Sequence, residues 1–192
     1  MNVYQILYLT FLAASLIICF CSYQSFGQNK SLKVFSVLLP VALLTEIIYH
    51  TYKLLYKVKY IFIYHAYIPF EYAMLAYFFY VNSSNEAARK FIFYSVPVFM
   101  LGSACISIYV VSLDKLPVLN FNFEGILLIS WSLITLFSIQ PTANLSITRL
   151  PVFWVCVGIL IFHPGIFLFN GVYDHIRRRI RSWLMNFTNL QI

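Results

Sequence analysis

Six acidic or imidazole side chains lie inside long apolar stretches of the sequence, where polar groups are expensive to place. An ionised group at the centre of a membrane-spanning helix costs about 2.5–3.5 kcal/mol on insertion scales, so such residues usually face a bundle interior or a wet cavity. One interpretation is a ligand-binding or proton-responsive cluster. Its members would be Glu46, His50, His65, Glu71, Glu124 and His163.

Two other interpretations use the same residues. Paired acids and imidazoles can hydrogen-bond across helices and fix their packing, which contributes about 0.6–2 kcal/mol for each pair. A metal site is the third interpretation, but carboxylate bundles that bind metals usually carry a Glu-x-x-His pair on each of two helices. The sequence contains no such pair, and Glu46 and His50 form a single Glu-x-x-x-His spacing. We therefore expect no metal and no other cofactor.

Glu71 is the acid that we expect to lie deepest. At 1.5 Å per helical residue it lies roughly 16 Å from the end of its helix, whereas Glu46 and His65 lie roughly 7 Å in. A carboxylate there cannot face lipid cheaply, so it must point inward and either take a proton or pair with another helix. The surrounding aromatic stretch YIFIYHAYIPFEY predicts either close aromatic packing or an aromatic-lined pocket for a hydrophobic ligand.

The composition requires long apolar helices to position these groups. Of 192 residues, 61% are hydrophobic and 10% are charged, against about 45–50% and 25% in soluble domains. The mean hydropathy is +0.81. The sequence lacks the GxSxG, HExxH, GxGxxG and P-loop motifs. We expect an integral membrane protein with little mass outside the bilayer and no enzymatic activity.

The apolar stretches are long enough to cross a bilayer, which takes about 20 residues. They predict an all-α polytopic membrane helix bundle of about six transmembrane helices. The expected spans are residues 4–26, 34–50, 60–81, 91–111, 117–139 and 150–171, joined by polar segments such as 82–90. Residues 173–192 form a basic tail.

The basic residues indicate the orientation, because cytoplasmic loops of membrane proteins are enriched in Lys and Arg. With six spans, eight Lys and Arg residues fall on the side of the termini and five on the other side. We expect both termini in the cytoplasm and the protein in the inner (cytoplasmic) membrane. The net charge of +7 is therefore attributed to orientation, and no nucleic-acid partner is expected.

The tail has two interpretations. Its apolar residues recur at helical spacing, which is typical of an interfacial helix on anionic lipid. The tail can also simply continue the last span as a positive-inside anchor. Its membrane-surface arginines are Arg177, Arg178, Arg179 and Arg181.

Two stretches carry a family resemblance. Residues 64–80 (YHAYIPFEYAMLAYFFY) and 150–170 (LPVFWVCVGILIFHPGIFLFN) resemble a group of small multi-span bacterial membrane proteins, some of which are similar to the membrane sensor part of histidine kinases. The resemblance implies family-type roles for Glu46, Glu71, Trp154 and Gly158, whereas His163 departs from the pattern. No kinase domain is expected. The chain also resembles, in size and topology, the membrane accessory protein of type VI-B CRISPR systems.

The leading hypothesis is a non-enzymatic sensor or accessory protein that passes a signal to a partner protein. The expected partner is another protein or a second copy of the chain. Alternatives are a small transporter or pore, the type VI-B accessory protein, and a membrane enzyme that uses the Glu and His residues. The sensor hypothesis predicts no ion flux, and the transporter hypothesis predicts flux in liposomes.

The six-span topology makes a direct prediction. Reporter fusions after Lys57 and after Ile192 should both report the cytoplasm, and a fusion after Asn85 should report the opposite side. The expectation rests on the asymmetry of eight basic residues against five. If the Asn85 and C-terminal fusions report the same side, the six-span topology is wrong.

Overall fold

The computed structural model describes residues 3–22, 31–56, 61–139 and 146–168, and all regular structure in these ranges is helical. A π-helix, η2 (Ile106–Val111), continues α4 directly, and a short 3-10 helix, η3 (Ile147–Arg149), precedes the last helix. The all-α prediction is confirmed for these residues. The long helices are α1 (Val3–Ser22), α2 (Lys33–Tyr56), α3 (Phe62–Asn82), α4 (Glu86–Cys105), α5 (Val118–Ser138) and an unlabelled helix, Pro151–Leu168.

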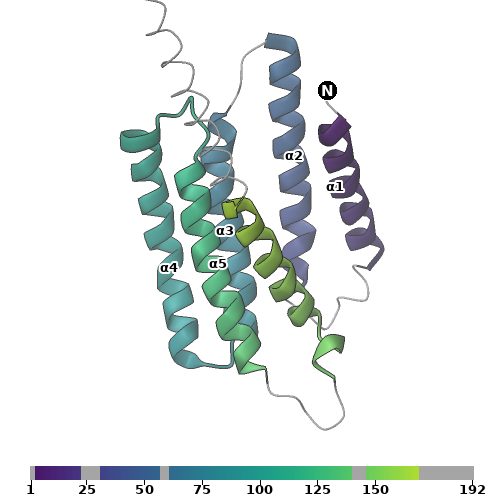
Figure 1. Ribbon diagram of the computed structural model, residues 1–192, viewed down its shortest axis with the longest axis vertical. Helices are drawn as coiled ribbons and strands as arrows, with labels where there is room; N and C mark the ends of the chain where they lie inside the picture. The colour runs from purple at the N-terminus through teal and green to yellow at the C-terminus, as the bar shows by residue number, and fades with distance from the viewer. Residues whose placement is uncertain (1–2, 23–30, 57–60, 140–145, 169–192) are drawn as a thin grey trace, which may run out of the picture.

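Successive helices alternate in direction. As Figure 1 shows, α1, α3 and α5 run one way, and α2, α4 and the Pro151–Leu168 helix run the other way. Helix α3 contacts α2, α4 and α5, whereas α1 contacts α2. The connections between consecutive helices therefore lie alternately at the two ends of the bundle, and α3 occupies its centre.

The apolar core forms around α3. Its Tyr72, Phe78 and Phe79 are fully buried, and the Tyr72 ring lies 4.4 Å from that of Phe99 on α4, measured between centroids. Cys156 brings the Pro151–Leu168 helix into the same core. Large aromatic side chains bury more surface than aliphatic ones, so a few α3 residues hold the bundle together.

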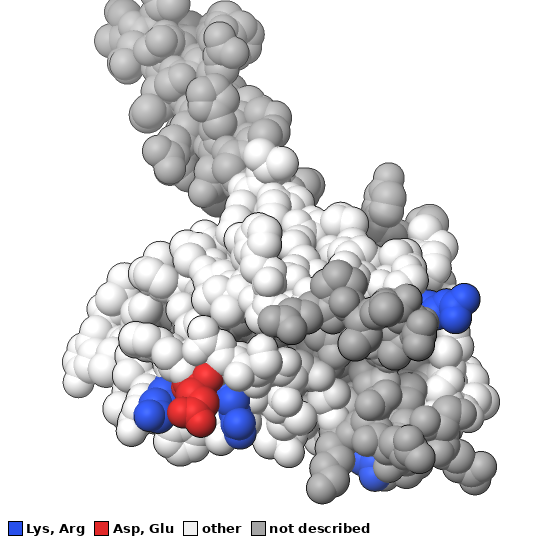
Figure 2. Space-filling view, turned by 90° about the horizontal axis from the view of Figure 1, so that it is seen from below, with Lys and Arg blue, Asp and Glu red and all other residues white. Residues whose placement is uncertain are grey.

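The outer surface of the bundle carries many large apolar side chains, whereas several polar side chains are buried. Phe137, Tyr109 and Leu54 are 87%, 83% and 82% exposed, whereas Glu124 is 0% exposed. Charged side chains are sparse on the end of the bundle seen in Figure 2. In the described part of the chain, four helices are long and apolar enough to cross a membrane: α2, α4 with η2, α5 and Pro151–Leu168. Helix α1 has a shorter apolar stretch, Ile6–Ser22.

The start of α4 corrects the sequence prediction. The expected polar loop at 82–90 ends early, because the helix begins at Glu86 rather than at residue 91. The Asn85 side chain caps it by accepting hydrogen bonds from the backbone N–H groups of Ala87 and Ala88, at 2.9 and 3.4 Å. Asparagine is a preferred N-cap residue, and an acid in the first turn favours the helix dipole. The polar residues before position 91 mark the limit of the apolar span, but the helix extends beyond that limit to Glu86.

Helix α2 likewise extends beyond its predicted span. Its predicted span ended at His50, but the helix continues to Tyr56 and includes Lys53. Lysine is a good helix former, so a charge ends an apolar stretch without ending the helix. Residues 23–26 and 169–171 of the predicted spans lie outside the described residues. So do the tail and its arginines Arg177, Arg178, Arg179 and Arg181.

Gly125 marks a close contact between α5 and the Pro151–Leu168 helix. A Cβ atom at this position would lie 2.7 Å from Phe167 Cζ and 2.9 Å from His163 Nδ1, whereas a Cβ at Gly102 would meet nothing within 4 Å. Both glycines are inside helices, where Ala is intrinsically favoured by about 1 kcal/mol. The two positions therefore form a matched pair.

We predict that Gly125→Ala lowers the free energy of unfolding by about 1–2 kcal/mol relative to Gly102→Ala, because overpacking outweighs helix propensity. The measurement is the unfolding of the two detergent-purified variants in parallel. Equal stability of the two variants would mean that the helices do not approach each other at Gly125.

Candidate ligand-binding pocket and buried polar core

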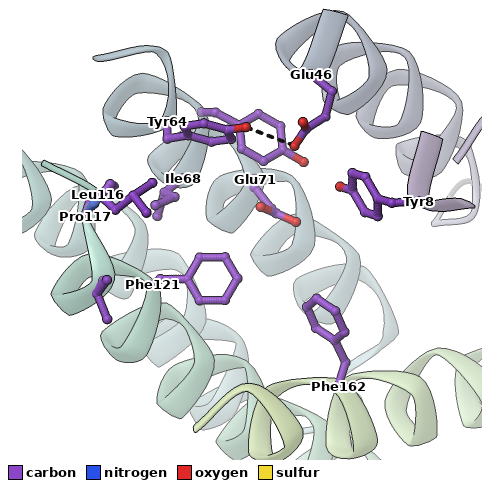
Figure 3. Close-up of a pocket in the computed structure, with 11 residues that line it drawn as sticks. Tyr8, Glu46, Tyr64, Ile68, Glu71, Leu116, Pro117, Phe121 and Phe162 are labelled. Carbon is purple, nitrogen blue, oxygen red and sulfur yellow. Dashed lines mark hydrogen bonds between the residues drawn. The ribbon is translucent and has the colours of Figure 1, made fainter. Parts of the chain in front are cut away.

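A pocket of about 280 Å³ opens between α1, α2, α3, α5 and the Pro151–Leu168 helix. It lies in the half of the bundle where α1, α3 and α5 begin (Figure 1). Acidic, phenolic and apolar side chains share its wall, as Figure 3 shows. The lining residues are Tyr8, Glu46, Tyr64, Tyr67, Ile68, Glu71, Leu116, Pro117, Val118, Phe121 and Phe162.

Glu46 enters the pocket from α2 and is held on both carboxylate oxygens. The Tyr64 hydroxyl donates a hydrogen bond to Glu46 Oε1 at 3.1 Å. His50 Nε2 lies 3.7 Å from Glu46 Oε2 and forms an ion pair when the imidazole is protonated. The four-residue spacing places the imidazole one turn further along the same helix face. Tyr64 therefore links α2 to α3 across the pocket wall.

Glu71 enters the pocket from α3, about two helical turns beyond Tyr64. The Tyr67 hydroxyl, four residues earlier on the same face, hydrogen-bonds to the Glu71 carboxylate. The Tyr8 hydroxyl from α1 points into the pocket toward the two acids (Figure 3). The pocket thus joins carboxylates from two helices to phenol groups from two helices.

The far side of the pocket is aromatic and apolar. Phe121 of α5 and Phe162 of the Pro151–Leu168 helix face Glu71 across the cavity (Figure 3). Ile68 and Leu116 complete the apolar wall. Among the described residues that line the pocket, none is basic.

His65 belongs to a different site, although it is next to Tyr64 in sequence. It is buried on another face of α3, where Nδ1 lies 2.7 Å from Ser107 Oγ and Nε2 lies 2.9 Å from the Lys115 carbonyl oxygen. Asn120 Nδ2 donates to Ser107 Oγ at 3.0 Å. A neutral His65 with its proton on Nε2 satisfies all three contacts, because Ser107 then donates to Nδ1. The network ties α3, η2 and α5 together.

The π-helix η2 carries Ser107 into this network. Its wider turn is terminated at Ser112, whose φ of 66° is unusual for a non-glycine residue. π-Helical segments often occur at functional sites. Here η2 positions a hydroxyl between an imidazole and an amide, so its immediate role is to complete the buried network.

Glu124 and His163 lie in the bundle core, away from the pocket wall. Glu124 is 0% exposed and His163 is 5% exposed. Both Glu124 carboxylate oxygens and His163 Nδ1 have no hydrogen-bond partner among the described residues. Glu124 is close enough to Glu71 for their negative charges to repel. Burying unpaired polar groups is costly, so these residues lower the stability of the core.

The structure therefore separates the residues singled out from the sequence into three groups. Glu46, His50 and Glu71 meet at the pocket; His65 joins the Ser107 network; Glu124 and His163 lie in the core. Among the described residues, no three His, Cys, Asp or Glu side chains are grouped to hold a metal ion.

Sequence reasoning missed several members of these groups. Tyr8 is separated from the acids by more than thirty residues, and only the packing of α1 brings it to the pocket. Ser107 gave no signal because serine is common in apolar helices. Asn120 could have been found, since it lies four residues before Glu124 and therefore on the same helix face.

Comparisons with protein-family models, with curated proteins and with solved structures each give no match. The resemblance of residues 64–80 and 150–170 to sensor-like membrane proteins therefore stays a prediction. Of the residues that it implies, Glu46 and Glu71 line the pocket. Trp154 Nε1 donates to the Thr148 carbonyl at 2.8 Å, which secures the start of the last helix.

The unpaired carboxyl group in the core generates a stability prediction. Glu124→Met should raise the free energy of unfolding by about 1–3 kcal/mol, because an apolar side chain of similar length removes a buried group that has no partner. Leu128→Met, at a fully buried position one turn further along α5, is the control and should cost less than about 1.5 kcal/mol. Thermal unfolding of the purified protein is the measurement. A large loss for Glu124→Met would show that its oxygens are paired in the folded protein.

Proposed function

We propose that the chain is a non-enzymatic integral membrane protein that senses a small ligand in this pocket and passes its occupancy to a partner protein. The observation that carries the proposal is the pocket itself, where Glu46 and Glu71 face a shared cavity inside a bundle with an apolar exterior. Such concave sites, mostly apolar with a few convergent polar groups, are the usual form of small-molecule sites.

Membrane insertion is supported by the distribution of apolar side chains. Groups as large as Phe137 and Tyr109 are almost fully exposed, which is unfavourable in water and favourable in lipid. In this proposal α1 and α3, with 20 and 21 residues, complete a six-span bundle together with the four helices that meet the length and hydropathy needed for a span. Their lengths match the roughly 20 residues that a bilayer requires.

The orientation with both termini in the cytoplasm depends on residues beyond the described ranges. Among the described basic residues, Lys53 and Lys115 lie near the end of the bundle where α1 begins, and the opposite end carries more. Those at the opposite end are Lys33, Arg89, Lys90 and Arg149. The proposed orientation therefore rests on Lys57, Lys59 and the tail arginines, which outnumber this group.

Helix α3 offers a route from the pocket to the rest of the bundle. One face carries Tyr64, Tyr67 and Glu71 to the pocket, while other faces carry His65 and Tyr72 to networks with η2, α4 and α5. A ligand that binds more tightly to one placement of α3 within the bundle shifts the population of molecules toward that placement. This coupling supports a sensor or accessory role.

Transport is the second candidate, and one observation favours it. Buried polar side chains follow one face of α5 through the core, at spacings of three to four residues around Leu128. Buried polar groups lined up on one helix face are a feature of ion and proton pathways, although Leu128 interrupts this line. The polar residues of this face are Asn120, Glu124, Ser132 and Thr135.

Two measurements on the full-length chain test the proposal. Proteoliposomes should show no flux of H⁺, Na⁺ or K⁺ above protein-free vesicles. In intact cells, a photo-cross-linker placed at Trp183 in the basic tail should trap a discrete partner protein or a second copy of the chain. The yield of this cross-link should change in the Glu71→Gln variant. Glu71→Gln should preserve the melting temperature, because the amide has the size of the acid and its oxygen can still accept from the Tyr67 hydroxyl.

The control is Glu86→Gln, an exposed acid at the other end of the bundle, which should leave the cross-link unchanged. Ion flux would establish the transporter instead. Glu71→Leu separates a functional acid from a structural one: preserved stability with an altered cross-link supports sensing. If both Glu71 variants lose much of their stability, Glu71 is a packing residue and the sensing role fails.

A further inference from the structure

We propose that the ligand of this pocket is an organic cation, namely a protonated amine attached to a small apolar body. The inference rests on the proposed function, because it assigns a ligand class to the same site. It draws on four properties of the pocket: its charge, its hydrogen-bonding groups, its aromatic rings and its size.

The charge of the lining is the first observation. Glu46 and Glu71 face the cavity from α2 and α3, and no basic side chain lines it among the described residues. His50 lies at 3.7 Å from Glu46 but is not part of the lining. Glu124, behind Glu71, is close enough to interact with its charge. A cation in the cavity is attracted to both lining carboxylates, and this attraction is stronger away from water.

The direction of the hydrogen bonds is the second observation. Tyr64 and Tyr67 donate their hydroxyl protons to Glu46 and Glu71. These two donors are thereby occupied. Apart from the Tyr8 hydroxyl, which can also donate, the polar atoms left facing the cavity are carboxylate and phenol oxygens, which accept. An ammonium group has only donors and no acceptor, so it complements this wall. A carboxylate or phosphate ligand would meet acceptors and negative charge.

The aromatic rings are the third observation. Phe121 and Phe162 face the acids across the cavity, and Tyr8 closes it from α1 (Figure 3). A cation within about 6 Å of an aromatic face gains about 0.5–2 kcal/mol. The combination of acids on one wall and rings on the other fits an ammonium head group. Ile68, Leu116 and Val118 can enclose an apolar body.

The size of the pocket limits the ligand. Its volume of about 280 Å³ lies at the lower end of the roughly 300–1,000 Å³ that small-molecule sites span. A single ring with a short amine chain fits this space. A complete phospholipid does not, so an amine-bearing lipid could place only its head group here.

Three soluble probes of nearly the same shape test the assignment: 2-phenylethylamine as the cation, 2-phenylethanol as the neutral analogue and phenylacetate as the anion. Calorimetric titration of the detergent-purified full-length chain measures each affinity. The cation should bind at least tenfold more tightly than the alcohol, and the anion should bind more weakly than the alcohol. Equal affinity of cation and alcohol would overturn the inference.

Variants connect the selectivity to the named residues. Glu46→Gln and Glu71→Gln should each weaken cation binding at least tenfold and change alcohol binding less than threefold, whereas Glu86→Gln should change neither. Phe121→Leu keeps both acids and should weaken the cation two- to fivefold, so a misfolded Glu variant does not end the test. Unchanged cation affinity in both Glu variants would contradict the inference.

A pocket-filling variant distinguishes failure of the ligand class from failure of the proposed function. Leu116→Trp fills the pocket and leaves the acids in place. Suppose that cation and alcohol bind the unsubstituted chain with equal affinity and that Leu116→Trp abolishes the binding of both. The pocket is then a binding site for another ligand class, and the proposed function survives. If no probe binds and Leu116→Trp leaves the Trp183 cross-link unchanged, both the ligand class and the sensing function fail.

Discussion

The apolar exterior of the bundle determines where its polar side chains can go. With residues such as Phe137 and Tyr109 covering the outside, acids, imidazoles and amides within the helices have only the interior for partners. Buried polar groups are costly unless they are hydrogen-bonded, so the interior becomes a set of networks. The pocket acids with their tyrosines form one network, and His65 with Ser107 forms another.

Helix α3 makes these networks part of one structure. Its residues alternate among faces at the helical period, so neighbouring positions such as Tyr64 and His65 serve different sites. Tyr72 adds a third contact, since its hydroxyl lies 2.6 Å from Ser95 Oγ and accepts from Trp131 Nε1 at 3.3 Å. A displacement of α3 at the pocket must therefore disturb contacts with α4, η2 and α5. This geometry is the physical basis for treating the pocket as an input site.

Within the described part of the chain, some polar groups in the core lack the hydrogen-bond partners that the groups in the two networks have. Both Glu124 oxygens and His163 Nδ1 are buried without hydrogen-bond partners among the described residues, and Gly125 lets the helix that carries His163 approach α5 closely. Features that cost stability are commonly found where activity needs them. Glu124 is close enough to Glu71 to interact with its charge, so the core and the pocket are connected electrostatically through these two acids.

The sequence by itself determined the helical class and most helix positions, because long apolar runs and their polar interruptions are local properties. Helix α4 begins before the span predicted at 91–111, and α2 ends after the span predicted at 34–50, since polarity ends an apolar span without breaking the helix. The sequence also placed Glu46 and His50 on one face, which needs only helical spacing. Only the tertiary structure decided that Tyr8 joins Glu46 and Glu71, that His65 pairs with Ser107, and that Glu124 remains apart. These groupings depend on the rotation and packing of helices around α3, which single-helix periodicity does not specify.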